Sequence, residues 1–250
     1  MSDFYDQLTP FYHLIYGDWE AAIETQAAQL STIISKYWDQ PIQTVLDASC
    51  GIGTQTIGLA DKGFRVTASD LSAEEIKRAK EEAKRRHLDI HFSVCDMREA
   101  YRHHQAQFDL VISCDNSIPH LLNDEEILKA LSQLYACTCS GGGCLLTLRD
   151  YDKEPRGSNI VKPYGVREEA DKRYFVFQIW DFEGDVYDLS FYFIEEERQS
   201  NSVKTHVMRS RYYAISPRHL AQLMEEAGYV AVVRLDDEFF QPVLVGRKAS

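Results

Sequence analysis

The stretch Val45-Leu46-Asp47-Ala48-Ser49-Cys50-Gly51-Ile52-Gly53-Thr54 decides the fold of this 250-residue chain. A short apolar run leads into an acidic residue, a turn of small residues with two glycines, and then a helical pattern. Glycine permits a sharp turn and leaves no side chain between the loop and a ligand. The helix that follows offers unpaired N–H groups at its start. In α/β proteins, this arrangement holds an adenine-containing cofactor at the carboxyl end of the first strand.

Asp70 supports the same interpretation. It ends the next apolar run, about 17 residues after Gly53, where an acid contacts the ribose hydroxyls in such folds. Two glycines alone would be weak support. The combination of Asp47, Cys50-Gly51-x-Gly53 and Asp70 is much more specific than an ordinary strand–turn–helix that needs glycine for geometry alone.

Strand-like and helical patterns alternate along the first part of the chain, which predicts right-handed crossovers and a parallel sheet. Strands are expected at about 43–48, 64–69, 89–94, 108–114 and 144–148. Helices are expected at about 19–38, 54–61, 72–86 and 124–138. A helix at about 216–227 and strands at about 229–235 and 241–247 follow near the end of the chain.

The rhythm changes after Asp152. Runs at about 173–182, 186–195 and 203–213 are strand-like, with no helix between them. We therefore predict an α/β fold with a Rossmann-like, seven-stranded, mostly parallel sheet whose last strand is antiparallel, plus an inserted antiparallel β meander. Residues 1–250 are expected to form a single domain with an N-terminal helical cap at 1–40 and a β-rich lid at 153–215. Within that lid, 153–170 is the expected flexible loop.

Composition narrows the class of protein. The formal net charge of −12 disfavours a nucleic-acid partner, because such a surface repels phosphate. No apolar run approaches the roughly 20 residues of a membrane helix, and the acidic, aromatic start is unlike a signal peptide. Six cysteines without an export signal predict reduced thiols and a cytoplasmic location. We expect Cys137, Cys139 and Cys144 to be buried thiols, His103-His104 to be solvated, and no metal to be bound.

Two cofactors compete for the glycine loop. A nicotinamide site usually has the pattern G-x-G-x-x-G, but here Ser49 stands at the first position of the triplet and Thr54 or Thr56 at the third glycine. The stretch resembles instead the first motif of class I S-adenosylmethionine (SAM)-dependent methyltransferases, apolar-Leu-Asp-x-small-Cys-Gly-x-Gly. This resemblance implies SAM as the cofactor and S-adenosylhomocysteine (SAH) as its product.

Polar residues at the ends of other expected strands point to the rest of the site. Asp96 could bind the adenine amino group, and Met97 could cover the ring. Asn116 and His120 follow the fourth strand at the switch point of the sheet, where ligands bind. Asp115, beside them, could instead be a helix cap.

Arg149 follows the fifth expected strand, and its guanidinium could bind a carboxylate in bidentate fashion. A surface ion pair with Asp150 or Asp152 is the alternative. The chain also lacks the Asn-Pro-Pro-Tyr motif of enzymes that methylate base or glutamine amides.

Over most of its length the chain looks like the glycine and sarcosine N-methyltransferase group. The matching segments are Tyr12, Gly17-Asp18, Asp47 to Gly53, Asp70, Asn116-Ser117, His120-Leu121, Arg149-x-Tyr151-Asp152 and Arg209-x-x-Tyr212-Tyr213. The resemblance implies that Arg149 binds an amino-acid carboxylate, that Asn116 and Tyr212 orient the substrate, and that the N-terminal segment lies over the cofactor. One departure matters: Trp19–Ala22 lacks the arginine that meets the SAM carboxylate in that group.

The expected reaction is in-line transfer of the SAM methyl group to the nitrogen of a small, carboxylate-bearing amine such as glycine or sarcosine. The expected catalytic residues are Asn116, Arg149 and Tyr212, with His120 as a further substrate contact. The expected cofactor contacts are Tyr12, Asp47, Gly51, Gly53, Asp70, Leu71, Asp96, Met97 and Cys114. Methylation of another small molecule at nitrogen or oxygen, a non-catalytic SAM-binding protein and a nicotinamide-dependent oxidoreductase stay open as alternatives. The sequence does not indicate the oligomeric state.

Overall fold

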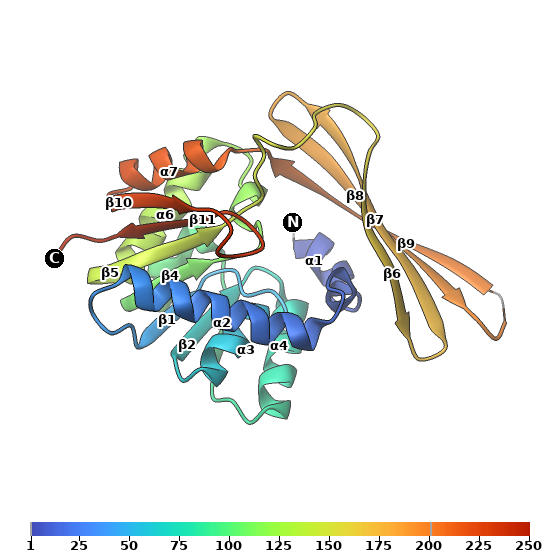
Figure 1. Cartoon of the computed structure of the whole chain (residues 1–250), viewed down its shortest axis with the longest axis horizontal. Coiled ribbons are helices and arrows are strands. Elements are labelled where there is room, and N and C mark those ends of the chain that lie inside the picture. Colours follow the sequence, from blue (N-terminus) through green and yellow to red (C-terminus); the bar gives the residue numbers. More distant parts are fainter. Residues whose placement is uncertain (1, 201) are drawn as a thin grey trace.

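The computed structural model describes residues 2–200 and 202–250 and contains two separate sheets (Figure 1). The larger sheet has seven strands in the order β10-β11-β5-β4-β1-β2-β3. Its strands are β1 Thr44–Asp47, β2 Arg65–Asp70, β3 His91–Val94, β4 Phe108–Ser113, β5 Thr138–Thr147, β10 Val230–Leu235 and β11 Val243–Arg247. The last strand, β11, runs antiparallel to both of its neighbours. The predicted Rossmann-like sheet is therefore confirmed.

Helices cover both faces of this sheet (Figure 1). The α-helices are α1 Ser2–Leu8, α2 Trp19–Tyr37, α3 Thr54–Asp61, α4 Ala73–Arg85, α5 Ala100–His104, α6 Asp124–Cys137 and α7 Pro217–Glu226. The 3-10 helices are η1 Tyr12–Ile15, η2 Met97–Glu99 and η3 Ile118–His120. Successive side chains of a strand point to opposite faces, so Val45 packs with Leu30 of α2 and Leu46 packs with Leu131 of α6. This alternation fixes the register that brings the carboxyl ends of β1, β2 and β4 together.

The second sheet is antiparallel and has four strands, β6 Ile160–Glu169, β7 Lys172–Glu183, β8 Val186–Glu197 and β9 Ser202–Tyr213. The sequence indicated the last three of these strands. The expectation of a flexible loop at 153–170 is wrong for β6. Pro163 and Gly165 interrupt the strand pattern there, and the pairing with β7 shifts register between them. Because β6 lies at the edge of the sheet, it tolerates a proline.

The fifth strand begins earlier than expected and includes the glycines that precede 144–148. β5 starts at Thr138 and runs through Gly142 and Gly143. A Cβ atom on Gly142 would lie 2.5 Å from the carbonyl oxygen of Asp109, and one on Gly143 would collide with the indole of Trp38. These two glycines are therefore required by close packing inside the sheet and not by a turn.

The N-terminal helix α1 lies between the two sheets (Figure 1). Phe4 and Leu8 are buried in the core of the second sheet, where they pack with Tyr187 and Phe193 among others. Among the described residues, no helix is both long and apolar enough to span a membrane.

Candidate functional site

The glycine loop connects β1 to α3 and has the backbone shape that its sequence predicts. Gly51 and Gly53 have φ values of 52° and 95°, in the left-handed region that favours glycine. The carboxylate of Asp47 holds the loop: it accepts hydrogen bonds from the Thr56 hydroxyl at 2.6 Å and from Ser49 N at 3.3 Å. Burial raises the pKa of Asp47 to about 7. Asp47 thus shapes the loop from beneath.

Asp70 at the end of β2 ties that loop to the start of α4. Its Oδ2 accepts from Gly51 N at 3.0 Å, and its Oδ1 accepts from Ser72 N at 2.9 Å. Burial raises the pKa of this carboxyl, although the backbone donors oppose the shift. Each carboxylate oxygen can accept more than one hydrogen bond, so Asp70 keeps capacity for ribose hydroxyls.

Glu75 is a further buried acid at this loop. Its residue is 1% exposed, and its Oε1 has no hydrogen-bond partner in the part of the chain that the structure describes. A Cβ atom on Gly51 would lie 3.7 Å from Glu75 Oε2. Burial, followed by the negative charge of Asp70, raises the pKa of Glu75 well above its usual value. Two acids therefore share a dry environment at the turn where a cofactor would bind.

The sequence analysis did not single out Glu75 as a site residue. The sequence predicts a helix at about 72–86, and in the structure Ser72 Oγ at the start of this helix accepts a hydrogen bond from Glu75 N at 3.1 Å. The available signal was the helix face: Glu75, Ala79 and Ala83 recur at helical spacing and all three are buried.

Leu71, Asp96 and Met97 line a small cavity of ≈ 50 Å³ together with Asp70 and His120. The Asp96 carboxylate is not free in this state.

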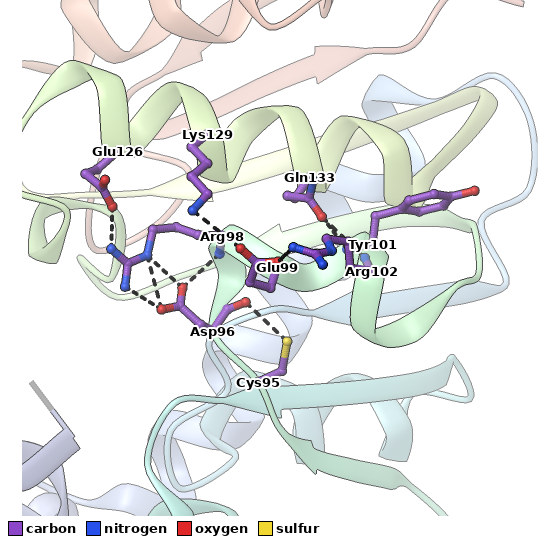
Figure 2. Close-up of polar contacts among 9 residues, drawn as sticks. All are labelled: Cys95, Asp96, Arg98, Glu99, Tyr101, Arg102, Glu126, Lys129 and Gln133. Atoms are coloured by element: carbon purple, nitrogen blue, oxygen red, sulfur yellow. Dashed lines mark hydrogen bonds and ion pairs between the residues drawn. The ribbon is translucent and has the colours of Figure 1, made fainter.

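The Asp96 carboxylate accepts hydrogen bonds from Arg98 Nε at 3.0 Å and from Arg98 N at 2.9 Å, and Arg98 also contacts Glu126 (Figure 2). A contact between Asp96 and an adenine amino group stays a prediction, and it requires one of these bonds to be shared.

Three tyrosines of the N-terminal segment form a row over the glycine loop. The ring of Tyr12 stacks between those of Tyr5 and Tyr16, with centroid separations of 6.3 and 6.4 Å. A Cβ atom on Gly51 would lie 3.8 Å from the Tyr12 hydroxyl. Hydrogen bonds hold both ends of the row. The Tyr5 hydroxyl is 2.5 Å from His120 Nε2, and the Tyr16 hydroxyl donates to Asp115 at 2.9 Å.

The loop after β4 carries two consecutive non-glycine residues in the left-handed region. Asp115 has φ 55° and Asn116 has φ 67°, a conformation that costs energy unless its surroundings enforce it. Here the Thr147 hydroxyl accepts from Asp115 N, and the Thr147 carbonyl accepts from Asn116 N. The alternative role of Asp115 as a helix cap is wrong, because Ser117 is the residue that precedes η3.

The Asn116 side chain connects this loop to the end of β5. Its Oδ1 accepts from Arg149 N at 3.0 Å, and its Nδ2 donates to the Tyr151 hydroxyl at 2.9 Å. Asn116 is buried, so both bonds are shielded from water. The strained backbone and these bonds fix Asn116 relative to Arg149.

Arg149 has an incompletely paired guanidinium. Its Cζ lies 4.6 Å from the centre of the Trp180 ring, its Nη2 is 3.4 Å from the Tyr164 hydroxyl, and Glu154 Oε1 is 3.9 Å away. Its Nε is buried and has no hydrogen-bond partner among the described residues. The alternative of an ion pair between Arg149 and Asp150 is wrong, because Asp150 pairs with Arg234 at 2.6 Å and Lys153 at 3.0 Å.

Aromatic rings wall the cavity in front of Arg149. This cavity measures ≈ 50 Å³, and Tyr12, Asn116, Arg149 and Tyr212 all line it. The Tyr212 ring lies 3.9 Å from that of His120. Burial lowers the pKa of His120 to about 3, so this ring is neutral at pH 7.

A wider cavity of ≈ 730 Å³ opens beside it and reaches Ala21 and Ala22 at the start of α2. Arg149 and Tyr16 line this cavity as well. No cation comes from the early part of α2, where Glu20 instead pairs with Arg85 at 2.9 Å and with Arg86. The start of α2 therefore faces an open cavity and supplies no arginine to it.

The structure thus brings most of the expected site residues to three adjoining surfaces. Asn116, Arg149 and Tyr212 share one cavity, and Asp70, Leu71, Asp96, Met97 and His120 share another. Asp47, Gly51 and Gly53 shape the loop between them. Cys114 lies in the apolar core with residues of α2 and β1, and burial raises its pKa well above the usual value.

Part of this chain is similar to a known protein family. Residues 45–142 match the model of a methyltransferase domain. This segment is therefore similar to a methyltransferase domain. It holds the glycine loop, Asp70, Asp96 and Asn116, so the predicted resemblance to SAM-dependent methyltransferases is confirmed, with SAM as the cofactor of the class.

Curated proteins that are similar to this chain include two glycine/sarcosine N-methyltransferases. The protein of Aphanothece halophytica is 37% identical over 108 residues, which are 43% of this chain and 41% of the relative. The protein of Parasynechococcus marenigrum is 30% identical over 145 residues, 58% of this chain and 50% of the relative. The chain therefore spans half or less of the length of these two relatives.

A solved structure matches almost the whole fold. SAM-bound CalS10, an amino pentose methyltransferase from Micromonospora echinaspora, superposes with a TM-score of 0.78. The match covers 91% of this chain and 92% of that chain at 14% sequence identity. At this identity the likeness supports the fold alone.

Proposed function

We propose that this protein transfers the methyl group of SAM to the amine nitrogen of a small amino acid such as glycine or sarcosine. The observation that carries the substrate class is Arg149. Its buried, unpartnered Nε faces no protein acceptor in the described chain, and Arg149 lines a cavity next to the glycine loop. A guanidinium in this situation favours a planar, bidentate carboxylate.

The residues at the loop fit SAM as the group bound there. When bound, SAM supplies the activated methyl group through its sulfonium. Asp70 would hold the ribose, while Leu71, Asp96 and Met97 would contact the adenine. Buried acids at the loop suit a cationic ligand, because a buried charge is stabilised by an opposite one. The free N–H groups at the start of α3 would bind the SAM carboxylate in place of the missing arginine.

Catalysis would come mainly from positioning. Arg149 would anchor the substrate carboxylate, and Asn116 and Tyr212 would orient the amine toward the methyl carbon. Holding two reactants in line converts a bimolecular step into an effectively unimolecular one. The aromatic walls exclude water and favour positive charge near their ring faces.

The second sheet and the N-terminal segment would close over the reactants. Phe4 and Leu8 pack in the core of the second sheet, whereas Tyr5 contacts His120 and the hydroxyl of Ser72 donates to Asp6 at 2.6 Å. Helix α1 thus bridges the second sheet and the methyltransferase domain. We propose that residues 1–40 act as a cap and 153–215 as a lid within a single functional domain.

The test is SAH production from SAM by the purified protein with glycine, sarcosine, dimethylglycine or glycinamide added in turn. Glycinamide has the same amine as glycine but no carboxylate. We expect turnover with glycine or sarcosine and at least about tenfold less with glycinamide, since a lost charged hydrogen bond costs ~1.5–3 kcal/mol. SAM binding without turnover on any amine would contradict the proposal and favour a non-catalytic SAM-binding protein.

A further inference from the structure

We propose that Cys95, His103 and His104 form a binding site for a zinc ion beside the adenine-binding loop. Cys95 directly follows β3, and the two histidines end α5. One ligand atom from each of the three side chains lies within 4.8 Å of the other two. The inference does not depend on the proposed methylation reaction.

The chemistry of the donor set favours zinc. One thiolate and two imidazoles are a combination that Zn²⁺ binds, and a set without carboxylates disfavours Mg²⁺ and Ca²⁺. Three protein ligands leave a fourth position for water. His103 is exposed, so an ion can enter from solvent.

His104 is prepared for binding a metal. Its Nε2 lies 3.2 Å from the hydroxyl of Ser69. A histidine that binds a metal commonly makes a hydrogen bond through its other ring nitrogen, so Ser69 would orient His104 to bind through Nδ1.

Cys95 connects the site to the cofactor surface. Its thiol donates to the carbonyl oxygen of Asp96 at 3.2 Å (Figure 2), and the residue also lines the cavity that contains Asp96 and Met97. A thiol binds a metal as thiolate, so metal binding displaces the thiol proton and the affinity should increase with pH. A bound ion would fasten α5 to the end of β3.

Cobalt(II) titration of the reduced full chain tests the site, because a Co²⁺–thiolate bond absorbs in the near ultraviolet. We expect this absorption to saturate at one equivalent and Zn²⁺ to abolish it. Cys95→Ser should remove the band, and His104→Gln should weaken Co²⁺ binding at least about tenfold. Cys139→Ser is the matched control, because Cys139 is more exposed than the other cysteines and lies away from the cluster.

His103→Gln changes an exposed position, so it keeps the test valid if Cys95→Ser fails to fold. It should weaken Co²⁺ binding and leave the Tm of the metal-free protein unchanged. Absence of the charge-transfer band in the wild-type chain would overturn the proposal. A band that survives Cys95→Ser, or that is lost in Cys139→Ser, would overturn it as well.

Discussion

Asp70 and Glu75 are neighbouring buried acids with different surroundings. Asp70 accepts hydrogen bonds from two backbone N–H groups, whereas Glu75 Oε1 accepts none within the described chain. This difference assigns them different roles. We expect Asp70 to contact a ligand at the loop, whereas Glu75 is a buried acid whose ionisation the fold opposes.

Replacement of Asp70 by Ala should abolish SAM binding, because the ribose loses its acceptor and the glycine loop loses its tie to β2. Isothermal titration calorimetry with SAM measures this directly. Asp89→Ala, which changes an exposed acid, should leave the affinity unchanged. An Asp70→Ala protein that binds SAM as tightly as the wild type would remove Asp70 from the cofactor site.

Glu75→Gln should stabilise the protein more at pH 8 than at pH 5. An acid whose pKa is raised by folding holds its proton longer in the folded state than in the unfolded state. Stability therefore falls as the pH rises from the unfolded pKa toward the folded one. Glutamine is neutral at both pH values, and the gain should be roughly 1–3 kcal/mol at pH 8.

Thermal unfolding at the two pH values measures the effect of Glu75→Gln. Glu81→Gln, at an exposed position of α4, serves as the control and should change little at either pH. Equal Tm changes at pH 5 and pH 8 would show that the ionisation of Glu75 does not oppose folding.

Among the elements, α1 is short and yet joins the two sheets. Deletion of residues 2–8 should accelerate SAH release by at least about tenfold, because Phe4, Leu8 and the Tyr5 contact with His120 are lost together. Stopped-flow displacement of SAH measures the rate. Tyr5→Phe removes only the hydroxyl and should have a smaller effect. An unchanged release rate after the deletion would show that α1 does not cover the cofactor.

The elements that the sequence predicts best are those with an unbroken pattern. Strands β1 and β4 are mostly apolar runs that are largely buried, and α2 keeps its helical spacing over Trp19–Tyr37. β6 could not be predicted because Pro163 and Gly165 break its pattern, and pairing with β7 decides its conformation. The first residues of β5 could not be predicted either, because they include glycines, which the sequence pattern assigns to a turn but which close packing requires.

The residues of the candidate site also differ in how well the sequence predicts them. One short stretch of sequence contains Asp47, Gly51, Gly53 and Asp70, and their spacing alone predicts a cofactor loop. The proximity of Glu75 to Gly51, and of Cys95 to His104, depends on how a helix packs against a loop. A pattern along one segment cannot indicate contacts that arise between segments.

At the level of the whole molecule, ligand binding should stabilise the folded chain. A ligand that binds only the folded state adds ~2.7 kcal/mol at a concentration of 100 Kd. We therefore expect SAH to raise the Tm by several degrees and NADH to leave it unchanged, as measured by thermal shift. Stabilisation by NADH without stabilisation by SAH would favour an oxidoreductase and contradict the cofactor assignment.

We expect Arg149 to bind the carboxylate of a small amine next to SAM. The most direct measurement is the steady-state kinetics of sarcosine methylation by the wild type and by Arg149→Gln, with Arg173→Gln on the exposed side of β7 as the matched control. We expect Arg149→Gln to raise KM at least about tenfold, equivalent to ~1.4 kcal/mol, and to leave the Kd for SAM unchanged. The kinetics of the control should also be unchanged. A KM for sarcosine that is the same in Arg149→Gln and in the wild type would contradict this expectation.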